Sequence, residues 1–249
     1  MSEDYKEAFE KTRVAGSIAA GALDEVAKII KPGIKTNKID EVCYNFIKDH
    51  GAYSAPLFYR GFPKSCCTST NHIVCHGIPS DKILNEGDIV NVDVTAFKDG
   101  WHGDTSRTFE IGETSVKAKK LVKTTHDAMM SAIKIVKENI YLGDIGATIQ
   151  SYVEAQGFSV VQDFCGHGIG QTFHKEPNVL HYGEKGTGEK IKAGMIFTIE
   201  PMINLGNYET KLLNDGWTAV TKDKTLSAQF EHTIGVTKDG YEIFTLSKN

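Results

Sequence analysis

Four acidic side chains stand inside or beside runs of apolar and β-branched residues. They are Asp93, Asp104, Glu200 and Glu231. Burying an unpaired carboxylate is costly, so such acids are normally paired with a base or with a metal ion. The only cation close to them in the sequence is Arg107, which is too few for four acids. A cluster of carboxylates around one or two divalent cations would resolve this conflict.

Each acid taken alone is a weak signal, because a single aspartate at a strand end is more often a turn or capping residue. Asp93 and Asp104 are eleven residues apart, with Gly100 in the intervening turn. This spacing permits a hairpin that brings both carboxylates to one side. The pair alone does not distinguish a metal site from a turn.

The histidines extend the candidate donor set. His167 lies in the glycine-rich segment 166–170, where the backbone can approach a ligand closely, although a turn with an incidental histidine would look the same. His174 follows seven residues later, and His76 lies in the turn-like segment 74–79. Carboxylates with one imidazole suit Mn, Fe(II), Co or Zn. No role is assigned to the other histidines, which are His50, His72, His102, His126, His181 and His232.

Other kinds of site find little support. The five cysteines contain no Cys-x-x-Cys pair, which disfavours structural zinc. The glycine-rich motifs of dinucleotide and phosphate binding are absent. A net charge of −4 provides no basic field, so direct nucleic-acid binding is not expected.

Composition indicates a cytoplasmic, non-membrane protein. The 249 residues can bury a large core. No apolar run approaches the roughly 20 residues that span a bilayer, and segment 1–6 is charged, unlike a secretion signal. The odd number of cysteines indicates reduced thiols.

The elements that must position these residues follow from apolar periodicity. It predicts helices over residues 5–30, 38–50, 116–139 and 145–156, and strands over 89–94 and 105–111. The rest is expected to form strands separated by glycine-containing turns. Helices and mainly antiparallel strands therefore alternate in two batches, which predicts an α+β fold.

The two batches resemble each other. A shift of 106 residues places the apolar positions of 34–51 on those of 140–157, and a shift of 107 places Asp93 on Glu200. Each of these acids also follows a glycine by six residues. Chance similarity is the alternative to an internal duplication that brings the two acids face to face across a pseudo-twofold axis. We expect a single catalytic domain, 1–249, with halves of about 5–112 and 113–249.

The order of the candidate ligands resembles the five-ligand set of the methionine aminopeptidases and their pita-bread relatives. The flanking residues agree as well, in Asn91-Val92-Asp93, His102-Gly103-Asp104-Thr105, Gly166-His167-Gly168-Ile169-Gly170, Thr198-Ile199-Glu200-Pro201 and Glu231-His232-Thr233. The resemblance covers nearly the whole chain. It implies the pita-bread fold, in which two pseudo-twofold related halves of antiparallel strands are backed by helices.

The resemblance implies a centre of two divalent ions (Co, Mn, Fe or Zn) that share an acidified water. Asp93 and Asp104 would hold one ion. The other would be held by Asp104, His167, Glu200 and Glu231, with Asp104 and Glu231 bridging. Glu200 would also accept a proton from the water.

The resemblance also implies substrate contacts. His174 matches the histidine that stabilises the developing oxyanion, and His76 matches one that contacts the scissile amide. The family lines its methionine pocket at the positions of Tyr59, Phe62, Cys67, Phe173, Met202 and Trp217. For Met202 we favour ordinary core packing. Phe62 replaces a common Tyr, and Pro56 replaces a Cys of some bacterial members, so the fine shape of the pocket can differ.

By this resemblance the chain looks like a bacterial-style type I enzyme, with no room for the Cys/His-rich extension of some eukaryotic forms. It would remove the initiator methionine when the second residue is small. Its partners would be nascent polypeptide N-termini near the ribosome, and a monomer is expected. The alternatives are a proline-specific peptidase of the same fold and a non-catalytic binding protein that has lost its metals.

Overall fold

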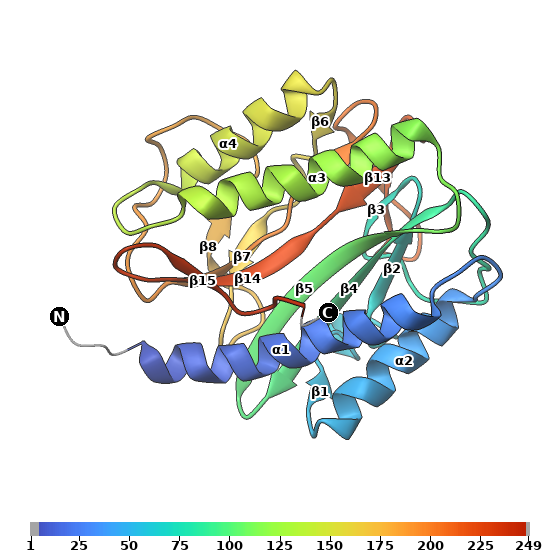
Figure 1. The fold of residues 1–249 in the computed structure, drawn as a ribbon, viewed down its shortest axis with the longest axis horizontal. Helices are drawn as coiled ribbons and strands as arrows, with labels where there is room; N and C mark the ends of the chain where they lie inside the picture. Colours follow the sequence, from blue (N-terminus) through green and yellow to red (C-terminus); the bar gives the residue numbers. More distant parts are fainter. Residues whose placement is uncertain (1–4, 248–249) are drawn as a thin grey trace.

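The computed structural model describes residues 5–247, which form a twisted sheet of nine strands backed by helices (Figure 1). The strands of this sheet are β1 (Tyr53–Ser54), β2 (Cys67–Thr70), β4 (Ile89–Lys98), β5 (Trp101–Glu110), β7 (Gly166–Gly168), β8 (Lys175–Val179), β9 (Ile196–Ile199), β14 (Glu231–Val236) and β15 (Tyr241–Ile243). The path through the sheet is β1-β4-β5-β14-β9-β7-β8, with β2 beside β4 and β15 beside β14. Every pairing is antiparallel.

Two small antiparallel sheets and a short 3-10 helix complete the strand layer. Their elements are β3 (Ile73–Cys75), β6 (Ser159–Val160), β10 (Met202–Asn204), β11 (Thr210–Leu212), β12 (Ala219–Thr221), β13 (Ser227–Gln229) and η1 (Tyr59–Gly61). The strand orders are β13-β10-β6 and β11-β12-β3.

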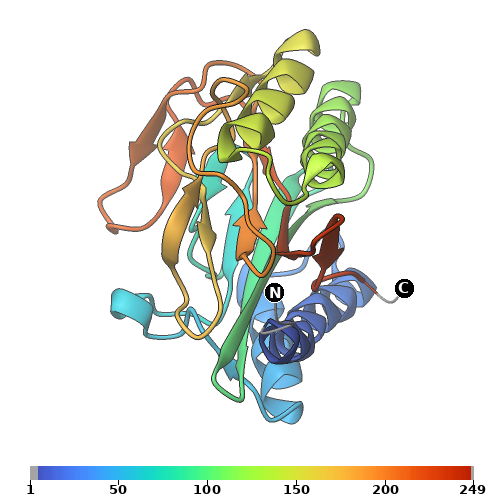
Figure 2. The same cartoon turned by 90° about the vertical axis from the view of Figure 1, so that its left-hand side faces the viewer.

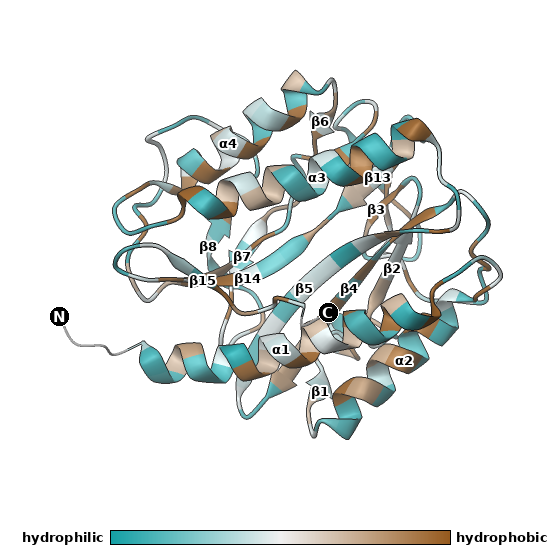
Figure 3. Ribbon diagram, in the orientation of Figure 1, coloured by the Kyte–Doolittle hydropathy of each residue, from teal (hydrophilic) through white to brown (hydrophobic). Residues whose placement is uncertain are grey.

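Two pairs of helices cover the sheet. They are α1 (Lys6–Ile29) with α2 (Thr36–Asp49), and α3 (Val116–Ile135) with α4 (Leu142–Ala155). Figure 2 shows α1 and α3 on the same side of the strands. Apolar and polar residues alternate along the helices (Figure 3), so each helix can bury one face and solvate the other. Among the described residues, no helix is long and apolar enough to cross a membrane.

Local signals explain where the helices of the second half begin. The Ser115 hydroxyl accepts a hydrogen bond from the backbone N–H of Ala118 at 3.2 Å and caps α3. The Asp144 carboxylate accepts from the N–H of Tyr141 at 2.8 Å in the first turn of α4. The apolar faces of these helices then pack on the sheet in one core, and those of α1 and α2 pack on it in another.

The two halves have matching elements, in agreement with the repeat found in the sequence. A shift of 106 residues carries the bounds of α2 onto those of α4 and the bounds of β1 onto those of β6. The strand pairing repeats as well. Ser54 pairs with Ala96, and Val160 and Ile203, which lie 106 and 107 residues further along the chain, pair with each other. The α+β fold with two pseudo-twofold related halves is therefore confirmed.

The halves meet where β5 pairs with β14. At this junction Ser106 lies opposite Glu231 on one side and opposite Asp93 on the other. Cross-strand partners and residues two positions away along a strand share one face of a sheet. Asp93, Asp104 and Glu231 therefore point to the same face, although they come from three different strands.

The opposite face of β5 is covered closely by α1. Because side chains alternate along a strand, Gly103 faces the helix while its neighbour Asp104 faces away from it. A Cβ atom at Gly103 would lie 2.2 Å from the backbone nitrogen of Gly16. Glycine at position 103 allows this contact, which holds the Asp104 backbone against the helix layer.

Four predicted boundaries were wrong by three residues or more. β4 ends at Lys98 rather than 94, β5 begins at Trp101 rather than 105, α4 begins at Leu142 rather than 145, and α3 ends at Ile135 rather than 139. The first residues of β5 are mostly polar, so apolar alternation does not identify them as part of a strand. The structure forms it because Asp99 and Gly100 both adopt positive φ, 48° and 86°, the geometry of a two-residue hairpin turn.

Candidate metal centre

Every residue that the sequence assigned to the metal centre or to the pocket lines one cavity of about 380 Å³. These residues are Tyr59, Phe62, Cys67, His76, Asp93, Asp104, His167, Phe173, His174, Glu200, Met202, Trp217 and Glu231. They come from both halves of the chain. The fold thus brings together groups that are far apart in the sequence.

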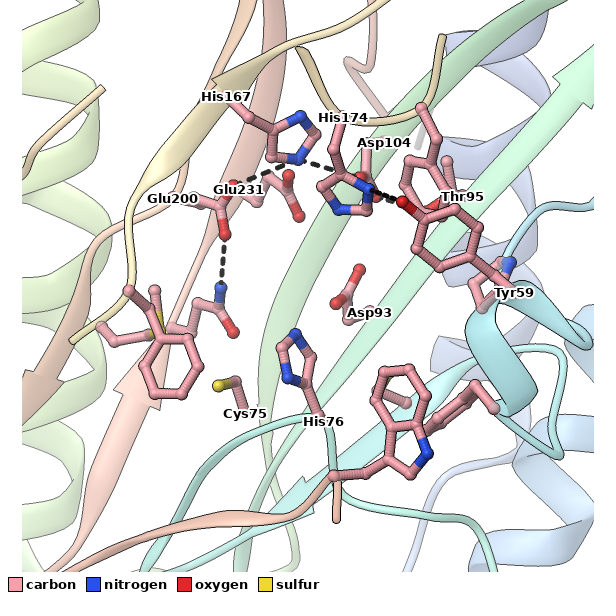
Figure 4. Close-up of a pocket in the computed structure, with 18 of the residues that line it drawn as sticks. Tyr59, Cys75, His76, Asp93, Thr95, Asp104, His167, His174, Glu200 and Glu231 are labelled. Atoms are coloured by element: carbon pink, nitrogen blue, oxygen red, sulfur yellow. Dashed lines mark hydrogen bonds and ion pairs between the residues drawn. The ribbon is translucent and has the colours of Figure 1, made fainter. Parts of the chain in front are cut away.

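The polar floor of the cavity is a cluster of buried acids and one imidazole (Figure 4). Asp104, His167 and Glu231 each offer a ligand atom, and these atoms all lie within 4.8 Å of one another. His167 Nε2 lies 3.7 Å from Asp104 Oδ2 and 3.6 Å from Glu200 Oε1. These separations leave room for a cation between the groups, which could be shared by several of them.

Burial shifts the titration of all four carboxyls. It raises the pKa of Asp93 to about 7 and that of Glu200 to about 8. Burial, followed by repulsion from the neighbouring carboxylates, raises the pKa of Asp104 and Glu231 well above the usual range. The cluster cannot hold four negative charges unaided near neutral pH, so it would favour a bound cation.

The four acids have no lysine or arginine partner: within residues 5–247, no such side chain forms an ion pair with any of them. Arg107, the one candidate from the sequence, points elsewhere: its Nη2 lies 3.2 Å from Asp24 Oδ1. Glu231 Oε1 is buried and has no hydrogen-bond partner. An orphaned carboxylate oxygen in a cluster of hard donors fits a divalent metal ion.

Two threonines orient the ligands and were missed from the sequence. The Thr198 hydroxyl donates to Glu200 Oε1 at 2.7 Å and accepts from the backbone N–H of His167 at 3.0 Å. The Thr95 hydroxyl donates to Asp104 Oδ1 at 2.7 Å. A threonine two positions before a strand-end acid, as in Thr198, was the available signal, since such residues share one face.

Two further hydrogen-bond partners of Glu200 were also not predicted from the sequence. Its backbone N–H donates to Nε2 of the fully buried His181 at 3.2 Å, and the Gln229 amide donates to its Oε2 at 3.3 Å. Only the fold reveals these contacts, because His181 lies on a loop and Gln229 lies on β13. Groups of this kind fix ligand orientation in metal sites.

The two remaining histidines face the cluster from other sides of the cavity (Figure 4). His174 Nδ1 is hydrogen-bonded to the Tyr59 hydroxyl at 3.1 Å, and its ring packs 4.2 Å from the His167 ring. Burial lowers the pKa of His174 to about 3 and also lowers the pKa of His76. Both rings are therefore neutral near pH 7.

Aromatic side chains form the apolar walls. Phe62 meets Trp217 edge-on at 5.2 Å between ring centroids, and Tyr59 packs against Phe173 at 4.9 Å. Cys67 adds a buried sulfur to the lining. Met202 contributes to both environments, since it lines the cavity and also belongs to a buried apolar cluster around Val74 and Ala219.

Comparison with known proteins points to metallopeptidases. The family description "Metallopeptidase family M24" matches residues 10–238. A methionine aminopeptidase of Rickettsia prowazekii is 58% identical over 240 residues, covering 96% of this chain and 93% of the relative. The methionine aminopeptidase of Escherichia coli K12 is 51% identical over 245 residues, covering 98% and 93%.

Solved structures agree. The crystal structure of methionine aminopeptidase from Rickettsia prowazekii matches with a TM-score of 0.96 at 57% identity and covers 97% of this chain and 98% of that one. A prolidase from Pyrococcus furiosus matches with a TM-score of 0.79 at 22% identity, covering 98% of this chain and 65% of that one, a likeness of fold alone. The pita-bread fold expected from the sequence is thereby confirmed.

Proposed function

The chain belongs to metallopeptidase family M24, and we propose that it is a methionine aminopeptidase, which hydrolyses the bond after an N-terminal methionine. One observation carries the proposal. Ligand atoms of Asp104, His167 and Glu231, drawn from strands far apart in the sequence, converge within 4.8 Å beneath an apolar pocket, and no described lysine or arginine pairs with them.

We propose that the centre takes two divalent ions, from among Mn, Fe(II), Co and Zn. Asp93 and Asp104 would hold one, and Asp104, His167, Glu200 and Glu231 would hold the other, with Asp104 and Glu231 shared. When bound, the ions supply a water acidic enough to act as hydroxide near neutral pH. The hard donors and the unpartnered Glu231 oxygen support this assignment.

The protein groups then divide the remaining work. Glu200 would accept the proton of the attacking water, since its carboxylate lies in the ligand cluster, 3.6 Å from His167 Nε2. His174, held by the Tyr59 hydroxyl, would donate a hydrogen bond to the oxygen that becomes negative. His76, on the other side of Asp93 in Figure 4, would contact the scissile amide.

The apolar walls account for the choice of methionine. An unbranched thioether can fill a narrow space between aromatic edges, and sulfur makes favourable contacts with such edges. Phe62 and Trp217 present such edges, and Cys67, Tyr59 and Phe173 line the same cavity. Phe62 lacks the hydroxyl that a tyrosine would add, which makes this wall more apolar.

We further propose that the substrates are nascent polypeptide N-termini, met near the ribosome in the cytoplasm by a monomeric enzyme. The similarity to bacterial methionine aminopeptidases supports this setting. The five cysteines are all free, as expected in a reducing compartment.

Mass spectrometry of a peptide series tests the proposal. Enzyme with added Mn, Co, Fe(II) or Zn is incubated with Met-Xaa-Ser peptides, in which Xaa is Gly, Ala, Ser, Leu or Lys. We expect methionine release far faster for Gly, Ala and Ser than for Leu and Lys. Equal rates across the series would contradict this function. Preferential cleavage of Xaa-Pro dipeptides would indicate a proline-specific peptidase, and a protein that takes up no metal would indicate a binding module.

A further inference from the structure

Arg60 is a cation that lines the substrate cavity and has no carboxylate partner in the described part of the chain. Its side chain is exposed, and within residues 5–247 no carboxylate forms an ion pair with it. The other exposed charged residue of the lining is Asp163, whose carboxylate accepts a hydrogen bond from the Thr210 hydroxyl at 2.6 Å. Arg60 therefore presents positive charge where substrate enters.

The backbone holds Arg60 in one place at a conformational cost. Its φ is +49° and that of Phe58 is +64°, a region that side chains other than glycine rarely adopt. Four backbone hydrogen bonds close this turn: Phe58 N–H to Phe62 O, Tyr59 N–H to Pro56 O, Gly61 N–H to Phe58 O, and Phe62 N–H to Tyr59 O. Strained positions that are fixed in this way occur preferentially at binding sites.

A short path of ring contacts connects Arg60 to the catalytic groups. Its guanidinium carbon lies 5.3 Å from the Tyr59 ring centre, and that centre lies 5.3 Å from the His174 ring centre. The guanidinium is thus no more than about 10.6 Å from the His174 ring. An extended peptide advances about 3.3 Å per residue, so the guanidinium lies within about three residues of His174 along an extended substrate.

The direction of the side chains in an extended substrate indicates which substrate position faces Arg60. In an extended peptide, side chains one and three point to the same side. The first side chain would enter the pocket between Phe62 and Tyr59, both of which belong to the same turn as Arg60. The third side chain would then face the wall that carries the guanidinium.

We propose that Arg60 is a specificity-determining residue that favours substrates with a carboxylate side chain at their third position. The proposal rests on the proposed aminopeptidase function, since it needs a methionine seated in the pocket. Arg60 recognises the acidic side chain through an ion pair at the mouth of the cavity. An exposed pair of this kind changes kcat/KM by about two- to fivefold.

The test compares amidated peptides Met-Ala-Glu-Gly-Trp and Met-Ala-Gln-Gly-Trp, and reads the ratio of their kcat/KM values. We expect a Glu/Gln ratio above 2 for the unaltered enzyme, near 1 for Arg60→Gln, below 1 for Arg60→Glu, and close to the original for Arg60→Lys. Lys48→Gln is the matched control, because Lys48 is an exposed cation 5.8 Å from the Tyr44 ring on α2 and does not line the cavity. That control must keep the original ratio.

Two further measurements vary the ionic strength and the position of the glutamate in the peptide. Raising ionic strength from 0.1 M to 1 M shortens the screening length from about 10 Å to about 3 Å, so the ratio should fall towards 1. Moving the Glu to the fifth position should abolish the preference. A ratio near 1 in the unaltered enzyme, or an equal ratio in Arg60→Gln, would overturn the proposal while leaving methionine release intact. Absence of methionine release from both peptides would instead overturn the proposed function.

Discussion

Replacing Thr198 by valine tests whether the metal centre depends on a neighbouring hydroxyl. Valine has nearly the shape of threonine, so the fully buried site keeps its packing. Two hydrogen bonds are lost: the donation to Glu200 Oε1 at 2.7 Å and the acceptance from the His167 N–H at 3.0 Å. This single substitution therefore removes a hydrogen bond from each of two proposed ligands, Glu200 and His167.

The magnitude follows from these two contacts. A hydrogen bond between neutral groups contributes about 0.5–1.5 kcal/mol, and a buried N–H left without an acceptor costs about 1–3 kcal/mol. We expect the free energy of unfolding to fall by about 3 kcal/mol, which for a chain of this size lowers the melting temperature by about 6–12 °C. The lost donor also favours the protonated form of Glu200, because the Thr198 hydroxyl lowers the pKa that burial raises. Metal affinity should therefore fall by about 10- to 100-fold.

Three measurements check this expectation: the melting temperature of metal-free protein, the affinity for Mn by calorimetry, and kcat/KM with a Met-Ala-Ser peptide. Thr198→Ser should recover most of the affinity because it restores the hydroxyl. Thr148→Val is the matched control, since its hydroxyl donates only to the helix carbonyl of Asp144, away from the cavity. If Thr198→Val binds Mn within twofold of the original and melts within 1 °C, the hydroxyl does not position these groups.

Three further outcomes are expected. Asp104→Ala should abolish hydrolysis and lower the metal content measured by mass spectrometry, and activity within tenfold would exclude a bridging role. His174→Ala should lower kcat by about 100- to 1,000-fold at nearly full metal content, because it removes an oxyanion donor; metal loss as severe as in Asp104→Ala would make it a ligand instead. Metal-free protein should lose stability as the pH rises from about 4 to about 8, because Asp93 and Glu200 ionise near their ordinary pKa values in the unfolded state, whereas burial raises these pKa values to about 7 and about 8 in the folded state. A melting temperature of the metal-free protein that stays level across this range would contradict the pKa argument.

Much of the site was predictable because acidic residues within apolar strands are costly to bury and are therefore easily recognised in a sequence. An acid such as Asp93 between two valines has few physical explanations, and the glycines around His167 narrow them further. The duplication was visible for a similar reason. Burial imposes the same apolar periodicity on both halves, so the bounds of α2 and α4 differ by the same 106 residues found in the sequence.

The supporting contacts could not be predicted, since they depend on groups that meet only after the strands pair. His181 and Gln229 are ordinary polar residues in the sequence, yet both bind Glu200. The start of β5 at Trp101 was hidden in the same way, because its hydrogen bonds to β4, and not apolar alternation, extend the strand to the turn.

The sequence by itself determined the types of metal-binding side chain, their order along the chain and the two similar halves. Residue types alone set the apolar periodicity and the cost of burying a charge. Only the tertiary structure decided which groups meet. The antiparallel junction of β5 and β14 sets Glu231 beside Asp104, leaves one carboxylate oxygen without a partner, and directs Arg107 to Asp24 instead. Distances of a few ångströms decide the electrostatics of buried groups, and such distances arise from long-range pairing that no short stretch of sequence contains.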